Sequence, residues 1–318
     1  MIIKSLIIAS MFFNMIGLQG VADRFDSAVI RDKAQAKKEV VASNNSLILP
    51  DILPRPKIKP MATKATANAR HYILADPNSG TVFAKNDADA QVPIASTTKI
   101  MSAVIALENY ELDDVATISY EASTQIGADA FLLANEKITI ESLLNCLLIK
   151  SGNDSAYAIA EHMNNGDEKG ITKFINKMNE KAKELGMNNT DYHDPAGLDV
   201  TGYSSARDLY IITKYALKFP KFKEIVKRDR FAVKSVDGTI WHDLKQSNRL
   251  VAEYNYPGAI GVKTGFMPEA GHVLVGAAER NGHTLISIVI NTYADTPSAS
   301  ADESRRLLDW GFNNIVWE

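Results

Sequence analysis

Residues 95–107 read ASTTKIMSAVIAL. A polar start followed by residues that are apolar on nearly every face predicts a helix buried on most sides, from Ile100 to Leu107. Ser96 and Lys99 are three residues apart where this helix begins, so their side chains lie on one face, one turn apart. An amine so placed can take the hydroxyl proton, and a helix N-terminus favours the negative charge that develops. Ser96 is therefore a candidate nucleophile and Lys99 its candidate base.

Short β-like runs lie at both ends of the domain around this helix. Residues 71–74 and 81–84 flank a turn-rich stretch, which predicts a hairpin. Two more hairpins are predicted near the C-terminus, with their turns at Asp237-Gly238 and Asn281-Gly282. These strands bracket a helical region, so we expect a mixed α/β (α+β) fold: one antiparallel sheet with flanking helices, and an all-helical lobe. The active site should lie between the sheet and the lobe.

The helical region contains three apolar stripes. The first follows the candidate cap Thr139, the second ends at Gly186 and the third ends at Pro220. Near the C-terminus, Ser300 and Glu303 have the spacing of a capping box, which predicts that a last helix opens there.

The composition excludes several classes of protein. The 318 residues are 46% hydrophobic and 23% charged, enough to bury a sizeable core. The formal charge of −3 is too balanced to indicate nucleic-acid binding, so no nucleic-acid partner is expected. The one cysteine, Cys146, lies in an apolar run and is predicted to be a core residue. No histidine spacing indicates a metal site, and we expect no metal and no cofactor.

The N-terminal region has two predicted parts. Residues 1–22 have the basic start, apolar middle and small residues of a secretory signal peptide, cleaved after Ala22. The alternative is an uncleaved anchor, which would be the only membrane association of the protein. Residues 23–69 lack glycine and contain four prolines, which predicts a flexible linker or, alternatively, a disordered remnant. The catalytic domain is then expected at residues 70–318.

Two further short motifs carry polar side chains. Ser151-Gly152-Asn153 lies between two helices, and Lys263-Thr264-Gly265 ends a short β-like run. Each is weak alone: Ser-x-Asn is usually a helix cap, and Val262 stands where a phosphate-binding loop requires glycine. Ser-x-x-Lys, Ser-x-Asn and Lys-Thr-Gly in this order, in a helix, a loop and a strand, are far more specific.

This combination occurs in penicillin-binding proteins and class A β-lactamases. From about residue 72 to residue 312 the chain resembles the D-alanyl-D-alanine carboxypeptidase family, the low-molecular-mass penicillin-binding proteins. The resemblance implies a β-lactamase/DD-peptidase-like fold and an exported enzyme of the cell envelope, in the periplasm or cell wall. It runs through ASTTKIM (95–101), KSGND (150–154), GLD (197–199), YSSARDL (203–209) and GVKTGF (261–266).

The resemblance implies a role for Ser96 and Lys99. Ser96 would attack the carbonyl between the two terminal D-alanines of a peptidoglycan stem peptide and form an acyl-enzyme that water hydrolyses. β-Lactam antibiotics would be covalent inhibitors of the same serine. For Lys99 to act as the base at neutral pH, its pKa must fall by ~3 from about 10.4, through burial and the like charge of Lys263.

The other motif residues receive roles from the same resemblance. Ser151 and Asn153 would complete a proton relay and hold the substrate amide. Lys263 and Thr264 would meet the terminal carboxylate, and Gly265 would leave room for a ligand backbone. The backbone N–H groups of Ser96 and Phe266 would bind the oxyanion.

The chain departs from the family pattern at three places. Relatives often carry an arginine for the substrate carboxylate shortly before the last helix, and residues 293–300 contain none. Ala196 stands where relatives frequently have histidine, so no role is expected there. A C-terminal membrane-tethering extension is not expected beyond Glu318. Within the YSSARDL motif, Arg207 and Asp208 are expected to form a structural ion pair.

Three alternatives use the same motifs. A class A β-lactamase needs a glutamate some thirty-odd residues after Asn153, and Glu184, at the end of a helix, is a poor match. A DD-endopeptidase or transpeptidase acting on cross-links would use the same residues in a groove of different shape. A non-enzymatic sensor of peptidoglycan or β-lactams is disfavoured because Ser96, Lys99 and Lys263 are all present.

Overall fold

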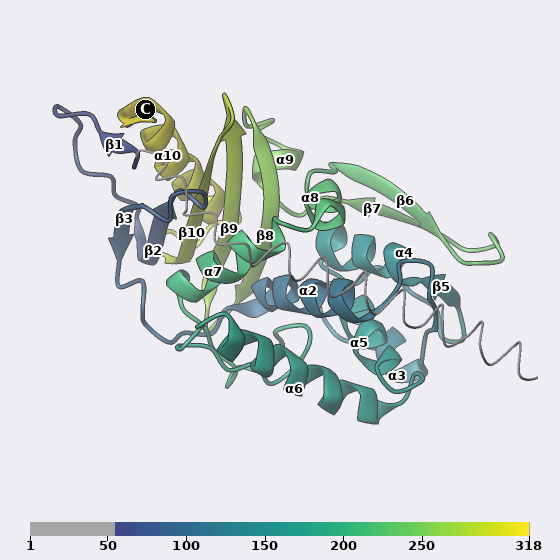
Figure 1. The fold of residues 1–318 in the computed structure, drawn as a ribbon. Helices are drawn as coiled ribbons and strands as arrows, with labels where there is room; N and C mark the ends of the chain where they lie inside the picture. Colours follow the sequence, from purple (N-terminus) through teal and green to yellow (C-terminus); the bar gives the residue numbers. More distant parts are fainter. Residues whose placement is uncertain (1–54, 318) are drawn as a thin grey trace, which may run out of the picture. The chain divides into compact units, whose positions relative to one another are not determined.

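A five-stranded antiparallel sheet brings the two ends of the domain together (Figure 1). The computed structural model describes residues 55–317. The strand order is β3-β2-β10-β9-β8, so β8 is an edge strand. The predicted hairpins at both ends of the sheet are confirmed. The strands are β2 (Ala69–Ala75), β3 (Val82–Asn86), β8 (Ala259–Met267), β9 (Gly271–Arg280) and β10 (His283–Thr292).

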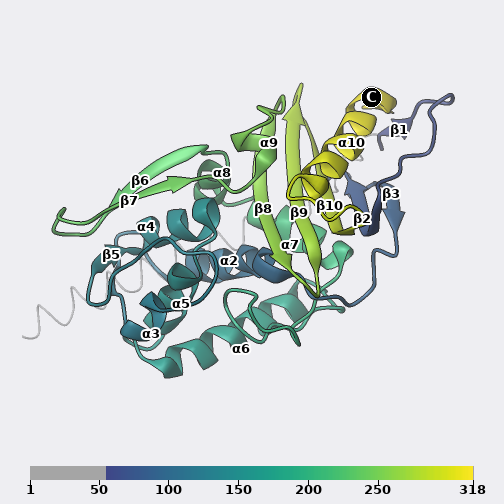
Figure 2. The same cartoon turned by 180° about the vertical axis from the view of Figure 1, so that it is seen from behind.

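Helices cover both faces of this sheet. α10 (Ala299–Asn314) packs on one face, against β9 and β10, and α7 (Ala206–Ala216) packs on the other (Figures 1 and 2). Residues 285–290 of β10 are all buried, as expected for a central strand covered on both sides.

The helical lobe is built around α2 (Lys99–Asn109), as residues 95–107 predict. Residues 99–106 of this helix are all buried. Thr139 accepts a hydrogen bond from Ser142 N and caps α4, which confirms the predicted cap. Cys146 is fully buried at the start of a π-helical turn, Cys146–Lys150, and the predicted core position is confirmed. The other helices here are α3 (Tyr120–Ser123), α4 (Ile140–Asn145), α5 (Asn153–His162), α6 (Glu168–Glu184) and α8 (Pro220–Val226).

Three small strand pairs complete the domain. The predicted hairpin at Asp237-Gly238 joins β6 (Arg230–Lys234) to β7 (Trp241–Lys245) as a separate ribbon over the lobe (Figure 1). β4 (Val115–Thr117) pairs with β5 (Lys137–Thr139), and β1 (Lys57–Ile58) pairs with β11 (Ile315–Val316). None of the helices within residues 55–317 has the length and apolarity to cross a membrane.

The expected end of the linker at residue 69 is wrong. β1 pairs with β11, Ala65 and Ala67 are buried, and Trp310 Nε1 donates to Thr63 O at 2.8 Å. Ala65 and Ala67 pack in the same hydrophobic cluster as Leu307 and Leu308 of α10. The proline-rich composition of the segment did not indicate this packing. The expected signal peptide, residues 1–22, and the linker up to residue 54 lie outside the described residues.

The predicted capping box of the last helix is also wrong. α10 begins at Ala299, two residues earlier than a cap at Ser300 implies, and its N-cap Ser298 makes no side-chain hydrogen bond to the helix. Glu303 instead accepts hydrogen bonds from the backbone N–H and the side-chain amide of Asn68, at 2.9 and 3.1 Å. The Glu303 carboxylate, which the local pattern assigned to the helix cap, therefore binds the backbone of Asn68, far away in the sequence.

The expected ion pair between Arg207 and Asp208 is not formed. Arg207 pairs with Asp89, while Asp208 accepts hydrogen bonds from Asn189 N and Thr190 Oγ1. Successive residues on a helix point to different sides, so neighbours cannot readily pair.

We expect Gly276→Ala to loosen α10 from the sheet. A Cβ at this position would lie 2.3 Å from Ser304 Oγ and 2.9 Å from Ser287 Oγ. Overpacking of this kind typically lowers the free energy of unfolding by about 1–3 kcal/mol. Denaturant unfolding measures the change. Gly202→Ala is the matched control, because its Cβ would meet nothing closer than 3.5 Å; equal stability of the two variants would contradict the packing argument.

Candidate active site

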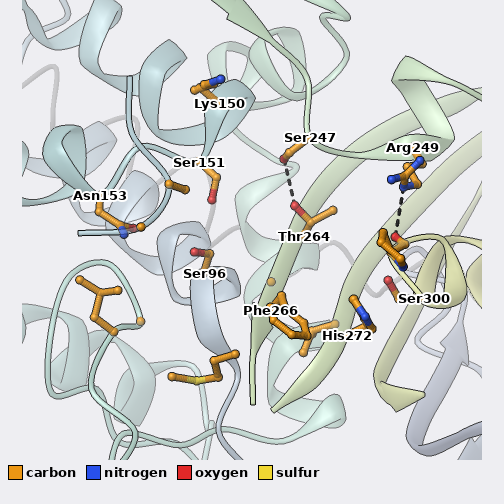
Figure 3. A pocket seen from close by; sticks show the side chains of 18 of the residues that line it. Ser96, Lys150, Ser151, Asn153, Ser247, Arg249, Thr264, Phe266, His272 and Ser300 are labelled. Atoms are coloured by element: carbon orange, nitrogen blue, oxygen red, sulfur yellow. Dashed lines mark hydrogen bonds between the residues drawn. The ribbon is translucent and has the colours of Figure 1, made fainter. Parts of the chain in front are cut away.

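A cavity of about 690 Å³ opens where the helical lobe meets edge strand β8 (Figure 3). Six of the eight candidate residues line it: Ser96, Ser151, Asn153, Thr264, Gly265 and Phe266. The other two, Lys99 and Lys263, are fully buried. The structure therefore brings together residues that are far apart in the chain: Ser96 and Phe266 are separated by 170 positions.

Ser96 lies in a 3-10 turn, η1 (Ala95–Thr98), directly before α2. Two glycines allow other segments to pack closely on this turn. A Cβ on Gly265 would lie 3.0 Å from Ile94 O and 3.3 Å from Ser96 N, and one on Gly197 would lie 2.0 Å from Ala95 O. The absent side chain of Gly265 thus lets β8 approach Ser96, a reason for this glycine that the sequence pattern did not suggest.

The Lys99 amine has three oxygen partners. Its Nζ lies 2.9 Å from Ser96 Oγ, 2.6 Å from Asn153 Oδ1 and 2.8 Å from Ala196 O. The amide and carbonyl oxygens accept only, so they occupy two N–H bonds of the amine. A neutral amine then has its lone pair left for the Ser96 O–H, which is the arrangement a general base requires.

Burial lowers the pKa of Lys99 to about 7, against opposition from the negative charges of Asp194 and Asp154. Burial was one of the two expected causes. The other, like charge, appears at the second amine: burial and then Lys99 lower the pKa of Lys263 well below its ordinary value. At neutral pH a substantial fraction of Lys99 is therefore neutral.

Asn153 is oriented by the loop at residues 124–136. Its Nδ2 donates to Ile126 O at 2.5 Å, which leaves Oδ1 to face Lys99. Ser151 has a left-handed backbone, with φ of 67°, at the end of the π-helical turn. Its hydroxyl and that of Ser96 point toward one another in the cavity (Figure 3).

Lys263 does not reach the cavity surface. Its Nζ donates to Ser151 Oγ at 2.7 Å and to Thr264 O at 3.0 Å. The expected direct contact of Lys263 with a substrate carboxylate stays a prediction; in the structure its amine contacts Ser151. Thr264 does line the cavity, and its Oγ1 donates to Ser247 Oγ at 2.9 Å (Figure 3).

Sequence reasoning missed the loop that carries Ala196. The buried carboxylate of Asp194 accepts four backbone N–H groups, from the residues at positions 196–199, at 2.6–2.9 Å. Ser102 Oγ also donates to Pro195 O at 2.5 Å. Together these contacts hold the Ala196 carbonyl against Lys99, so the backbone has a role where the side chain has none. Asp194-Pro195, with Gly197 two residues further on, is typical of a turn, but this local pattern does not indicate that the Ala196 carbonyl faces Lys99.

Sequence reasoning also missed Arg249, which lines the cavity wall opposite Ser151 and Asn153, while the other cationic lining residue, Lys150, lies on the Ser151 side (Figure 3). It belongs to the short helix α9 (Arg249–Ala252). Its Nε donates to Pro297 O at 3.1 Å, and its guanidinium also pairs with Glu253. The guanidinium thus reaches the segment before α10 where no arginine stands in the sequence.

No glutamate lines the described part of this cavity. Glu184 pairs with Lys181 at 2.7 Å and is not a wall residue. Within residues 55–317, no group of three or more histidine, cysteine or acidic side chains is arranged to hold a metal ion.

The comparisons with known proteins agree with this geometry. The sequence profile of the D-alanyl-D-alanine carboxypeptidase family matches residues 58–294. The chain belongs to this family. The D-alanyl-D-alanine carboxypeptidase of Streptomyces sp. (strain K15) is 35% identical over 79% of this chain and 91% of its own. The crystal structure of the Streptomyces K15 DD-transpeptidase superposes with a TM-score of 0.74 at 34% identity, covering 79% of this chain and all of that one.

Other relatives extend the comparison. DacF of Bacillus subtilis, a D-alanyl-D-alanine carboxypeptidase, is 32% identical over 77% of this chain, and the match spans 62% of its own length. A D-alanyl-D-alanine endopeptidase of Haemophilus influenzae is 32% identical over 66% of this chain and 70% of its own. Members of the family act on peptidoglycan peptides outside the cytoplasm and bind β-lactams. The family match confirms the predicted fold and the predicted assignment to the serine-type D-alanyl-D-alanine carboxypeptidases.

The rate at which penicillin acylates the protein should rise with pH and reach half its maximum near pH 7. Protonated Lys99 cannot accept the Ser96 proton, and its pKa is lowered to about 7, so the active fraction grows as pH increases through that value. Stopped-flow or quench measurements of acylation from about pH 5 to about pH 9 test this. A rate that keeps rising about tenfold per pH unit up to about pH 9 without levelling off, as a lysine with its ordinary pKa of about 10.4 would give, would contradict the neutral-amine assignment.

Proposed function

We propose that this protein removes the terminal D-alanine from peptidoglycan stem peptides through an acyl-enzyme on Ser96. The observation that carries the proposal is the Lys99 amine, buried and 2.9 Å from Ser96 Oγ, with its other contacts to acceptors only. A serine hydroxyl is a poor nucleophile unless a base takes its proton, and here the base is already in contact.

Acylation then proceeds with the residues in hand. Ser96 Oγ attacks the carbonyl between the two D-alanines, and its proton passes to Lys99. The C–N bond breaks, an ester forms, and the leaving amine takes a proton from Ser151, which Lys263 contacts at 2.7 Å. The proton held by Lys99 passes to Ser151, so both residues return to their starting states. In deacylation a water molecule adds its oxygen to the ester carbonyl, the C–O bond to Ser96 breaks, and one proton of that water goes to Ser96 Oγ through Lys99.

We place the oxyanion between the backbone N–H groups of Ser96 and Phe266. β8 is an edge strand, so one side of it has no strand partner, and Gly265 brings it against Ser96 N. One such donor typically contributes about 3 kcal/mol of transition-state stabilisation.

The substrate carboxylate is assigned to Thr264, Ser247 and Arg249. The two hydroxyls are 2.9 Å apart and Arg249 lies on the same side of the cavity (Figure 3). A guanidinium suits a carboxylate because it offers parallel N–H donors. Arg249 thereby replaces the arginine that relatives carry before the last helix.

We also propose that residues 1–22 are a signal peptide removed after Ala22 and that residues 23–54 tether the domain in the cell envelope. The basic start and uncharged middle of the first segment support this. Amino-terminal sequencing of the protein from its native envelope gives Asp23 if cleavage occurs and Met1 if the segment is kept as an anchor.

Incubation of the purified protein with a synthetic stem pentapeptide should yield a tetrapeptide and free D-alanine by mass spectrometry. Ser96→Ala should abolish this release and also covalent labelling by penicillin, because among residues 55–317 no other hydroxyl is hydrogen-bonded to Lys99. Thermal unfolding should change little. Release of D-alanine by the variant would refute Ser96 as the nucleophile, and cleavage of cross-linked peptides alone would favour an endopeptidase.

Arg249→Leu should reduce the preference for a free C-terminal acid over a C-terminal amide by about 10- to 100-fold, the effect of losing a charged hydrogen bond of about 1.5–3 kcal/mol. The ratio of kcat/KM for the two peptides measures it. Arg230→Leu, on the exposed β6–β7 ribbon, is the matched control and should leave the ratio unchanged. An unaltered ratio in Arg249→Leu would assign the carboxylate elsewhere.

A further inference from the structure

One buried side chain of the β6–β7 ribbon binds the loop at residues 124–136. His242, on β7, is 5% exposed. Its Nδ1 lies 3.1 Å from Ala130 O and its Nε2 lies 2.8 Å from Glu136 Oε1. Both partners belong to the 124–136 loop, which connects α3 to β5. No motif in the sequence pointed to this pair.

The contacts fix how His242 is held. A backbone carbonyl accepts only, so Nδ1 carries a proton. Nε2 faces Glu136 Oε1, and the second oxygen of Glu136 accepts from Leu133 N at 3.0 Å. The side chains of His242 and Glu136 are 4% and 0% exposed. The pKa of His242 is raised, first by its hydrogen bond to Glu136.

The same loop holds Asn153. Ile126 O accepts from Asn153 Nδ2 at 2.5 Å, and Ala128 O accepts from Asn153 N at 2.7 Å. A Cβ on Gly127 would approach Asn153 Nδ2 to 3.0 Å, so the loop backbone rests directly on this side chain. Gly127 and Ala128 also line the cavity.

Asp154 fixes the middle of the loop from the other side. Its Oδ2 accepts hydrogen bonds from Ala130 N and Leu132 N, both at 3.1 Å. Both backbone groups of Ala130 are therefore hydrogen-bonded: its N–H donates to Asp154, and its carbonyl accepts from His242. The loop is pinned between α5 and the β6–β7 ribbon.

We propose that His242 and Glu136 are positioning residues that fix the 124–136 loop and, through Ile126 and Ala128, the Asn153 amide that orients the Lys99 base. Neither touches the substrate. The β6–β7 ribbon thus becomes part of the catalytic apparatus and not only a cover of the lobe. This inference rests on the proposed acylation of Ser96.

The step that should suffer is acylation itself. Asn153 Oδ1 takes one N–H of Lys99, so a displaced Asn153 lets the amine turn its lone pair away from Ser96. Misplacement by about 1 Å can slow an enzyme about 100-fold. We expect His242→Phe to lower the acylation rate constant with penicillin by about tenfold or more, with a much smaller change in the dissociation constant of the non-covalent complex.

A pair of Glu136 variants separates positioning from loss of stability. In Glu136→Gln the amide Nε2 can donate to a neutral His242 while Oε1 accepts from Leu133 N, so both contacts persist without charge. Glu136→Ala removes both. Glu136→Gln should therefore acylate within about threefold of the parent, and Glu136→Ala should be slowed like His242→Phe. Trp241→Ala, an exposed neighbour on β7, is the control.

The experiment measures penicillin acylation of each full-chain variant, with circular dichroism and thermal unfolding to confirm the fold. Parent-like acylation by a folded His242→Phe, or equal rates in the two Glu136 variants, would overturn the inference. Because the readout is penicillin, a parent protein that is acylated but releases no D-alanine would refute the proposed peptidase activity and leave this inference standing.

Discussion

The rest of the site depends on one buried amine. Lys99 is excluded from water, and its Nζ contacts oxygen atoms from three separate segments: the Ser96 hydroxyl, the Asn153 amide and the Ala196 carbonyl. Dehydration of a cation is costly, and that cost lowers the pKa of Lys99 to about 7. The fold therefore has to deliver two acceptor oxygens to one point while leaving the third direction free for the nucleophile. Helix α2, the loop at residues 195–199 and the start of α5 meet at this point for that reason.

Close backbone approach is the second constraint, and glycines satisfy it. Gly197 brings the 195–199 loop onto the Ser96 turn, and Gly265 brings β8 onto the same turn from the other side. A side chain at either position would push one wall of the site away from the nucleophile. Lys-Thr-Gly is thus a packing motif as much as a binding motif. Lys263 is buried below the cavity surface, Thr264 lines the cavity, and Gly265 lets β8 lie close to the Ser96 turn.

Local patterns in the sequence predicted the elements well, and distant partners poorly. The spacing of Ser96 and Lys99, the hairpin at Asn281-Gly282 and the buried α2 follow from periodicity and turn chemistry. Glu303 has the spacing of a helix cap but binds Asn68, 235 positions away. Arg249 reaches the segment before α10 from a short helix that lies earlier in the chain. The partners of Glu303 and Arg249 depend on which donors and acceptors the folded chain leaves unpaired. The residues next to each of them in the sequence do not contain that information.

The edge of the sheet shows how the architecture confines reactivity. An edge strand exposes unpaired N–H and C=O groups that can pair with any extended peptide, which is a hazard unless the edge is covered. Along β8, helices α8 and α9 and the Ser96 turn all pack against the strand. The cavity meets the strand at residues 264–267, beside Ser96. An extended peptide paired with the open part of this edge would lie next to Ser96, with Arg249 at one end and Asn153 at the other. Most of the edge is thus covered by other elements, and the part left open is the part that borders the cavity.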